Sequence, residues 1–379
     1  MVMKKKIKVL LTVGSMGIGG NEVFVLNLVE NLNRDEFEVG VLIFSKLGIS
    51  DENISRLKKC GCKLFIGDSL GTRKDIIRDS IFVSKVVKDN KYDIVHCNSC
   101  SLIGLLKVTI PLKLQRKVKV ISHSHNSGNN NTCYLRKLMV DFMKIVLFFT
   151  VDFGLACSDK AAEAKYTNKF INSPKYRFIN NSIDTKKYIF DQNIRSKIRN
   201  GFDIQEDEFL IGNVGRFDYQ KNQEFLLKVM DALNKEGFKF KCILIGDGEN
   251  NKYLHTLSEK LNISNKIIFT GNRSDVNLLY SAMDCFVMTS RYEGFPFVLT
   301  EAQVNGLYCI VSDVISKDVN VTGEVKFLSL NDDYNIWAKQ IRKINRLRMS
   351  DESRNRIIMK YDITYEVKEI QSIYKRLYQ

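Results

Sequence analysis

Short apolar runs rich in β-branched residues alternate along this chain with longer amphipathic segments, and this alternation limits the fold more than any other feature. The runs that predict strands in the first half are 7–13, 38–44, 63–66, 93–97, 118–122 and 153–156. Those in the second half are 209–214, 241–245, 267–270, 285–289 and 308–311. Nearly continuous apolar strands separated by helical segments are typical of a parallel sheet covered on both faces. We therefore predict an α/β protein.

The alternation of strand and helix segments is interrupted once, at the polar stretch 180–184, and resumes at Phe209. A length of 379 residues favours two domains over one. We expect two Rossmann-like domains, residues 1–185 and 186–360, whose sheets face each other across a cleft. The last amphipathic segment, 361–379, has no strand after it. We expect it to form a helix that packs back on the first domain.

The composition predicts a cytoplasmic protein with free thiols. The nine cysteines form no C-x-x-C pair, and an odd number of them fits a reducing compartment. The apolar stretch near the N-terminus runs into Gly14 without a cleavage site, so we interpret it as a strand rather than a secretory signal. The longest apolar run elsewhere, 145–157, is shorter than the roughly 18 residues of a spanning helix.

Positive charge is concentrated in the first domain. The formal net charge is +15, and residues 1–185 carry 29 basic and 17 acidic side chains. Basic clusters lie at 4–8, 113–119 and 136–144. Two interpretations stay open: a solvated basic face, or a surface that rests on an anionic membrane. Nucleic acid is disfavoured because no aromatic-studded basic patch accompanies the charge.

The segment 291–301, RYEGFPFVLTE, follows an apolar strand and holds two carboxylates, Glu293 and Glu301. Glu293 lies in a loop marked by glycine and proline, and Glu301 follows a run that predicts the start of a helix. Open α/β sheets bind ligands at such a loop, and the free N–H groups of a helix N-terminus favour anions. The segment predicts a phosphate-binding site flanked by two acids, as a sugar nucleotide requires.

A second loop, 212–222, follows the first strand of the second half and carries Arg216 and Lys221. A guanidinium fork and an ammonium group five residues apart are able to converge on one diphosphate. The alternative is an exposed basic loop. Weaker signals follow the next two strands: Gly246-Asp247-Gly248, which a plain turn explains almost as well, and Asn272-Arg273.

The glycine-rich loop 14–20 follows the first strand and precedes a helix. It does not fit the dinucleotide fingerprint, and the second strand ends without the acid that would bind a ribose. A tight turn and a ligand loop explain it about equally well.

Three histidines, His96, His123 and His125, lie at the ends of adjacent predicted strands. The two-residue period of a strand places His123 and His125 on the same side. Their position favours function over structure, but their spacing matches no metal-ligand set, and we expect no metal site.

Taken together, these motifs resemble the retaining family-4 glycosyltransferases of GT-B fold, and look closest to the bacterial capsular and exopolysaccharide members. The resemblance covers essentially the whole chain. It is carried by the loop 17–20 with Asn21-Glu22, by His125-Asn126, by Gly215-Arg216 with Lys221-Asn222, by 246–249 and by 293–301. It implies that residues 1–185 bind the acceptor and that 186–360 bind the nucleotide sugar.

The resemblance also implies residue roles. Arg216 and Lys221 would bind the diphosphate, Glu293 the donor sugar and Glu301 the ribose. His125, with His123 as the other choice, would lie against the donor sugar at the reacting centre. His125, Glu293, Arg216 and Lys221 are therefore the expected catalytic residues. The other residues expected around the nucleotide sugar are Gly19, Gly20, Asn213, Gly215, Gly246, Asp247, Gly248, Asn272, Arg273, Gly294, Phe295, Pro296, Phe297, Val298, Leu299 and Thr300.

The implied activity is metal-independent, retaining transfer of a hexose or N-acetylhexosamine from a UDP-sugar to a lipid-linked saccharide. No cofactor beyond the donor substrate is expected, and the enzyme would work at the inner face of the plasma membrane. Two alternatives stay open: a sugar-nucleotide epimerase of the same fold, which needs no acceptor, and a catalytically silent partner subunit. The intact acids and cations argue against the silent subunit.

Overall fold

The computed structural model describes residues 5–17, 19–72, 74–99, 101–115, 118–125, 134–293 and 295–379, without the side chains of 134 and 135. Gly294 of the predicted donor site and Asn126 of the resemblance lie outside the described residues. So do residues 4, 116 and 117 of the predicted basic clusters. The chain forms two compact units, one of residues 1–182 with 363–379 and the other of residues 183–362. That the first unit binds the acceptor and the second the nucleotide sugar stays a prediction.

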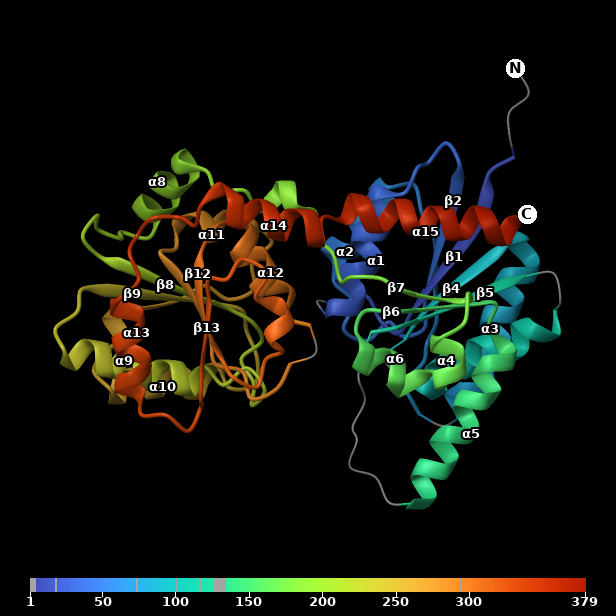
Figure 1. Ribbon diagram of the computed structural model, residues 1–379, viewed down its shortest axis with the longest axis horizontal. Helices are drawn as coiled ribbons and strands as arrows, with labels where there is room; N and C mark the ends of the chain where they lie inside the picture. The colour runs from blue at the N-terminus through green and yellow to red at the C-terminus, as the bar shows by residue number, and fades with distance from the viewer. Residues whose placement is uncertain are drawn as a thin grey trace. The chain divides into compact units, whose positions relative to one another are not determined.

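The first unit contains a seven-stranded parallel sheet in the order β3-β2-β1-β4-β5-β6-β7 (Figure 1). Its strands are β1 Ile7–Val13, β2 Phe37–Ile43, β3 Lys63–Ile66, β4 Ile94–Ser99, β5 Lys119–Ser124, β6 Phe153–Ala156 and β7 Tyr176–Phe178. The central strands are buried on both faces because helices cover the sheet on both sides. This explains their continuous apolar character.

Two layers of helices cover this sheet. One layer contains α1 Gly20–Asn31, α2 Asp51–Lys59 and α15 Ile363–Tyr378. The other contains α3 Asp75–Asn90, α4 Leu102–Leu114, α5 Tyr134–Thr150, α6 Asp159–Lys165 and α7 Asn168–Ile171. The return of the last helix to the first unit is confirmed, since α15 packs against α1, β1 and β4 and buries Ile370 and Tyr374 completely.

The second unit contains a six-stranded parallel sheet in the order β10-β9-β8-β11-β12-β13 (Figure 1). Its strands are β8 Phe209–Val214, β9 Phe240–Ile245, β10 Ile267–Phe269, β11 Cys285–Met288, β12 Tyr308–Ser312 and β13 Val325–Leu328. On one face lie α9 Gln223–Lys235, α10 Asn251–Lys260 and α13 Tyr334–Arg342. On the other lie α8 Gln192–Gly201, α11 Val276–Ala282 and α12 Phe297–Val304, and α14 Asp351–Tyr361 packs against α12.

Three short 3₁₀ helices, η1 Thr185–Tyr188, η2 Ser264–Lys266 and η3 Lys317–Val319, complete the second unit as described. Side-chain oxygens accept backbone N–H groups at several helix starts, which satisfies donors that a helix leaves free. The capping residues of the described helices are Ser50, Ser101, Ser158, Thr167, Asp191, Ser316, Asp333 and Ser350. Among the described helices, none combines the length and the apolar character needed to cross a bilayer.

The order of strand addition reverses once in each sheet, between β1 and β4 and between β8 and β11. Open α/β sheets bind ligands outside the carboxyl ends of their strands at this point. The predicted fold class, two parallel α/β sheets with a returning C-terminal helix, is confirmed. The loops that follow β8 and β11 are the ones on which sequence analysis placed Lys221 and Glu293.

Candidate active site

The loops after β8 and β11 lie side by side at the switch point of the second sheet and hold each other through both backbone and side chains. The backbone N–H of Arg291 donates to the carbonyl of Gln220 at 2.8 Å. The guanidinium of Arg291 donates to Oδ1 of Asn222 at 2.8 Å and lies over the ring of Tyr219, 4.3 Å from its centre. These contacts fix the position of Lys221 relative to Glu293.

Lys221 and Glu293, 72 residues apart in sequence, form an ion pair with 2.7 Å between Nζ and Oε1. Both side chains are largely withdrawn from water, with 20% of the lysine and 6% of the glutamate exposed. Gln220 donates to the carbonyl of Tyr292 at 3.0 Å beside this pair. The structure thus brings together the expected diphosphate cation and the expected sugar-binding acid.

Arg216, the second expected cation, extends from the same loop but remains 63% exposed. Its Nε atom donates to Oδ2 of Asp218 at 2.7 Å. Asp218 also accepts the backbone N–H of Lys221 at 2.9 Å. Arg216 and Lys221 therefore each have a carboxylate partner, whereas the guanidinium of Arg291 bonds to a neutral amide and leaves these loops with one excess positive charge.

Two glycines let the β9–α10 turn press against the 215–217 backbone. A Cβ atom on Gly246 would lie 2.1 Å from the carbonyl oxygen of Gly215, and one on Gly248 would lie 2.4 Å from that of Phe217. The N–H of Phe217 donates to the carbonyl of Asp247 at 3.0 Å. The Asp247 side chain accepts from the N–H of Gly248 and from Asn251, which lowers its pKa. Close packing explains both glycines, and a contact with nucleotide stays a prediction.

Glu301 lies inside α12 with both carboxylate oxygens occupied. The hydroxyl of Tyr280 donates to Oε2 at 2.8 Å and that of Tyr188 to Oε1 at 3.1 Å. Burial raises the pKa of Glu301, and the two hydroxyl groups oppose this rise. Tyr280 is itself completely buried. The acid expected at the ribose is therefore held in a fixed position.

The other residues expected around the nucleotide sugar divide into three groups. Phe297, Leu299 and Thr300 are buried, and their side chains belong to the interior. Asn213 is also buried and donates to the carbonyl of Val287, so it ties β8 to β11. Asn272 and Arg273 are exposed, and Arg273 pairs with Asp275 at 2.7 Å. Phe295 and Val298 are half-buried, Pro296 caps the start of α12, and Gly294 lies outside the described residues.

In the first unit the three histidines form one cluster at β4 and β5. Nε2 of His96 lies 3.2 Å from Nδ1 of His123, and Nδ1 of His96 lies 2.7 Å from the hydroxyl of Tyr374 on α15. Nε2 of His125 lies 3.0 Å from Oδ1 of Asn98. Burial lowers the pKa of His96 and of His125 to about 3 and that of His123 well below its usual value. His96 and His123 are inaccessible, while His125 is half-buried.

Gly19 and Gly20 lie at the N-terminus of α1, where the carboxylate of Glu22 folds back. A Cβ atom on Gly19 would lie 2.4 Å from Oε2 of Glu22. Burial raises the pKa of Glu22. Glycine is needed at position 19 for this close approach. A contact of Gly19 or Gly20 with a sugar donor or acceptor stays a prediction.

Similarity to known proteins decides the family. The family model "Glycosyltransferase Family 4" matches residues 18–187, and "Glycosyl transferases group 1" matches 194–361. An uncharacterized glycosyltransferase of Methanocaldococcus jannaschii, MJ1607, is 33% identical over 311 residues, which cover 78% of this chain and 77% of that protein. The chain belongs to the family-4 glycosyltransferases.

Further relatives of this glycosyltransferase have names that agree with this family. The putative glycosyltransferase EpsF of Bacillus subtilis is 27% identical over 88% of this chain and 86% of its own. The UDP-Gal:alpha-D-GlcNAc-diphosphoundecaprenol alpha-1,3-galactosyltransferase of Escherichia coli is 25% identical over 79% of each chain. The Anabaena protein HepE, solved in complex with UDP and glucose, has a TM-score of 0.75 at 18% identity and covers 98% of this chain and 100% of its own. This likeness confirms the GT-B fold.

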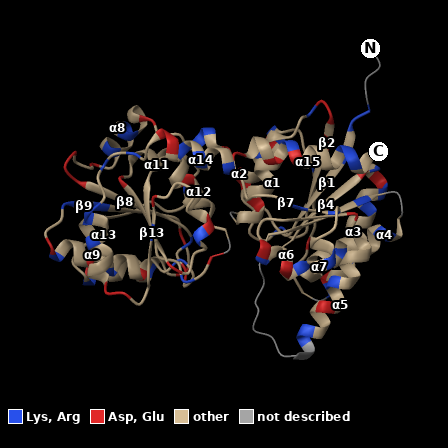
Figure 2. Ribbon diagram, viewed as in Figure 1, with Lys and Arg blue, Asp and Glu red and all other residues tan. Residues whose placement is uncertain are grey.

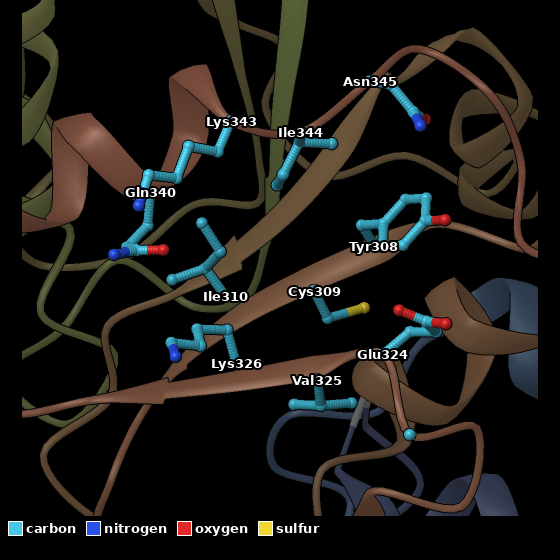
Figure 3. Close-up of a pocket in the computed structure, with 11 residues that line it drawn as sticks. Tyr308, Cys309, Ile310, Glu324, Val325, Lys326, Gln340, Lys343, Ile344 and Asn345 are labelled. Atoms are coloured by element: carbon cyan, nitrogen blue, oxygen red, sulfur yellow. The ribbon is translucent and has the colours of Figure 1, made fainter.

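One hollow in the described part of the glycosyltransferase lies away from the predicted site. It has a volume of about 290 Å³ and is lined by the first residues of β12 and β13 and by the end of α13 (Figure 3). Lys326, Lys343 and Gln340 face it together with Ile310 and Ile344 (Figure 3). It opens at the amino ends of these strands, whereas the loops with Lys221 and Glu293 follow carboxyl ends.

Sequence reasoning missed the groups that hold the expected site residues of the glycosyltransferase. Tyr188 and Tyr280 lie 113 and 21 residues from the glutamate that they support. Asn98 and Tyr374 support the histidines from other elements. The available signal was chemical: a tyrosine hydroxyl buried in a helix needs a hydrogen-bond partner.

Proposed function

We propose that this glycosyltransferase moves a hexose or N-acetylhexosamine from a UDP-sugar to a lipid-linked saccharide, with retention at the anomeric carbon, in the synthesis of a capsular or related polysaccharide. The observation that carries the proposal is the ion pair of Lys221 with Glu293 beside Arg216, at the switch point of the second sheet. It provides positive charge for a diphosphate and a carboxylate for sugar hydroxyls within a few ångströms of each other.

The proposed reaction breaks the bond between the anomeric carbon and the diphosphate oxygen and forms a bond to the acceptor hydroxyl oxygen. The proton of that hydroxyl passes to the departing diphosphate. Arg216 and Lys221 stabilise the negative charge that grows on the diphosphate, which is the role that resident cations have in such transition states. Removing one such group typically raises the barrier by about 2.7–4 kcal/mol.

Other residues would bind the donor. We assign the ribose hydroxyls to Glu301, whose carboxylate is a strong acceptor held by two tyrosines. We assign the transferred sugar to Glu293 and to His125, whose lowered pKa keeps the imidazole neutral near pH 7. A neutral imidazole both donates and accepts a hydrogen bond. Its half-buried position favours His125 over the inaccessible His123.

The comparisons support the substrate classes. The Escherichia coli relative is named for a UDP-galactose donor and a diphosphoundecaprenol-linked acceptor, and HepE was solved with UDP and glucose. At 25% and 18% identity these names suggest a class of donor and acceptor rather than a particular sugar. A lipid-linked acceptor also agrees with the basic first unit, which we expect to work at the inner face of the plasma membrane.

UDP release from a panel of UDP-sugars, measured with and without undecaprenyl-diphosphate-linked sugars, tests this proposal. We expect acceptor-dependent release, reduced about 100-fold or more in Lys221→Ala. The matched control is Lys228→Ala on α9, whose ammonium also pairs with a glutamate at 2.7 Å but outside the site. Unchanged turnover in Lys221→Ala would refute the assignment, and conversion of the donor without acceptor would indicate an epimerase.

Two further readouts test the stereochemistry and the role of the cations. Proton NMR of the product should show the anomeric configuration of the donor. Dialysis against EDTA should leave the rate unchanged, because Arg216 and Lys221 supply the charge in this proposal. An inverted product or a rate restored only by a divalent cation would contradict the respective point.

A further inference from the structure

Helix α5 of the first unit exposes a row of large apolar side chains to solvent. Leu138, Phe142, Ile145 and Phe149 are between 49% and 67% exposed. With about 100° of rotation per residue, these four lie within a sector of about 60° on one side of the helix. We call them the α5 stripe. Met139, which is 53% exposed, borders it.

The α5 stripe is not the inner face of the helix. The opposite side carries Val140, Met143 and Leu147, which pack into the core against α4 and its neighbours. Thr150 adds a hydrogen bond to Thr109 of α4 at 3.0 Å. Helix α5 is therefore anchored by one apolar side while a second apolar side faces outward. Its first turns project beyond the sheet and the other helices of its unit (Figure 1).

The adjacent helix α4 continues this character. Ile103, Ile110 and Leu114 repeat at intervals of seven and four residues and are 47%, 42% and 80% exposed. Single exposed apolar residues are normal on a soluble protein, but rows of them on two packed helices are unusual. Helices α4 and α5 therefore both expose rows of apolar side chains, which are more stable when removed from water.

Basic residues outnumber acidic ones around the α5 stripe. Arg136 and Lys137 are exposed at the projecting end of α5, where Figure 2 shows a basic cluster. The one acid in the α5 sequence, Asp141, lies 4.0 Å from Lys144. Lys113 at the end of α4 is 48% exposed and lies 3.8 Å from Asp152. Apolar side chains with flanking cations are the composition of helices that lie in the interface of an anionic bilayer.

We propose that the α5 stripe docks this glycosyltransferase on an anionic phospholipid bilayer, with α5 in the plane of the interface and its four side chains among the acyl chains. This inference rests on the proposed function, since it names the surface that brings the enzyme to a lipid-linked acceptor. A second copy of the chain fits less well, because two surfaces with the same excess of cations repel each other.

Flotation with lipid vesicles tests the proposal. We expect the full chain to bind vesicles of phosphatidylcholine mixed with phosphatidylglycerol and to bind pure phosphatidylcholine weakly. Phe142→Ser with Phe149→Ser should weaken binding about tenfold or more, because two exposed aromatic rings lose their apolar burial. The matched control is Leu347→Ser with Met359→Ser in the second unit, where both side chains are 72% exposed. This control should bind like the wild type.

A second pair of substitutions, Arg136→Ser with Lys137→Ser, should remove most of the preference for anionic vesicles, since each cation near such a surface contributes on the order of 1 kcal/mol, or about fivefold. Circular dichroism and the shift of the melting temperature by UDP should stay unchanged in all variants. Wild-type flotation by the stripe variant would overturn the proposal. So would a wild-type dimer that the stripe variant converts to a monomer without loss of flotation.

The failure of docking is separable from the failure of the proposed function. UDP release with a water-soluble, short-chain acceptor should be unchanged in Phe142→Ser with Phe149→Ser, while release with an acceptor embedded in vesicles should fall. Absence of transfer to either acceptor by the wild type, with flotation as expected, would refute the transferase assignment and leave the docking surface standing.

Discussion

Asp284 at the start of β11 joins a cluster of buried guanidinium groups, and its removal gives the sharpest test of how the second unit is stabilised. The carboxylate accepts from Arg195 at 2.6 Å, from Arg199 at 3.3 Å and from the N–H of Leu210 at 2.7 Å. Arg348 donates to carbonyls at the end of α11 nearby, at 2.7 and 2.9 Å. Burial lowers the pKa of Arg348 to about 9, the charge of Arg195 adds to this effect, and Asp284 opposes it.

Asp284→Asn keeps the shape and the acceptor for Leu210 but removes the charge. Loss of one partner of a buried ion pair typically costs about 3–5 kcal/mol. Solvent screens this pair little, because the side chain of Asp284 is 0% exposed and those of Arg195 and Arg199 are 16% and 8% exposed. Both arginines keep carbonyl acceptors, so we expect the lower end, about 3 kcal/mol. For a unit of this size that lowers the melting temperature by roughly 6–12 °C.

Trp337 makes this measurable, because it is the one tryptophan of the chain and lies completely buried in the second unit. Urea unfolding followed by its fluorescence therefore reports on that unit, and the midpoint should fall with an unchanged slope. The matched control is Asp207→Asn, whose partner Lys239 lies at the same 2.6 Å but with 59% and 74% of the two side chains exposed. Because solvent screens this exposed pair, the substitution should leave the urea midpoint nearly unchanged. Equal losses in both variants would refute the reasoning.

Two further predictions concern residues around the candidate site of the second unit. Tyr280→Phe removes a hydrogen-bond donor that favours the charged form of Glu301, so the pKa of that acid should rise further. If the Glu301 carboxylate binds the ribose as proposed, UDP affinity should then be lost at a higher pH as the pH falls. Calorimetric titrations with identical midpoints in both proteins would contradict this. Gly248→Ala should destabilise the second unit by about 1–3 kcal/mol and weaken UDP binding, because the added Cβ would press on the backbone of Phe217. The control is Gly201→Ala, whose added Cβ meets nothing within 4 Å and should have neither effect. Equal urea midpoints for the two variants would refute the packing argument.

The sequence predicted the βαβ architecture well because a strand buried on both faces must be apolar almost throughout. It missed β7 and β13, each at one edge of its sheet, where a basic residue, Arg177 or Lys326, interrupts a run of only three or four residues. The other edge strands, β3 and β10, keep three consecutive apolar residues and were predicted.

The candidate site was predictable in its residue types and strand positions but not in its pairings. Lys221 and Glu293 could be placed on two loops at one edge of the sheet, since parallel strands end together there. That they form an ion pair depends on β8 and β11 being neighbours, which the local pattern does not specify. The tyrosines that hold Glu301 depend in the same way on long-range packing of α11 and η1 against α12.

The ion pair of Lys221 with Glu293 has a consequence for the order of events in the proposed reaction. The Glu293 carboxylate, with 6% exposure, has the ammonium group of Lys221 2.7 Å away as its charged partner. A diphosphate that enters beside Lys221 competes with Glu293 for the same cation, and it carries more charge. Glu293 would then need new hydrogen-bond donors, and in the proposed assignment the sugar hydroxyls provide them. In this proposal, binding of the diphosphate takes Lys221 from Glu293, and the hydroxyls of the transferred sugar then bond to the carboxylate. Recognition of the diphosphate and of the sugar is thereby coupled without a movement of either loop.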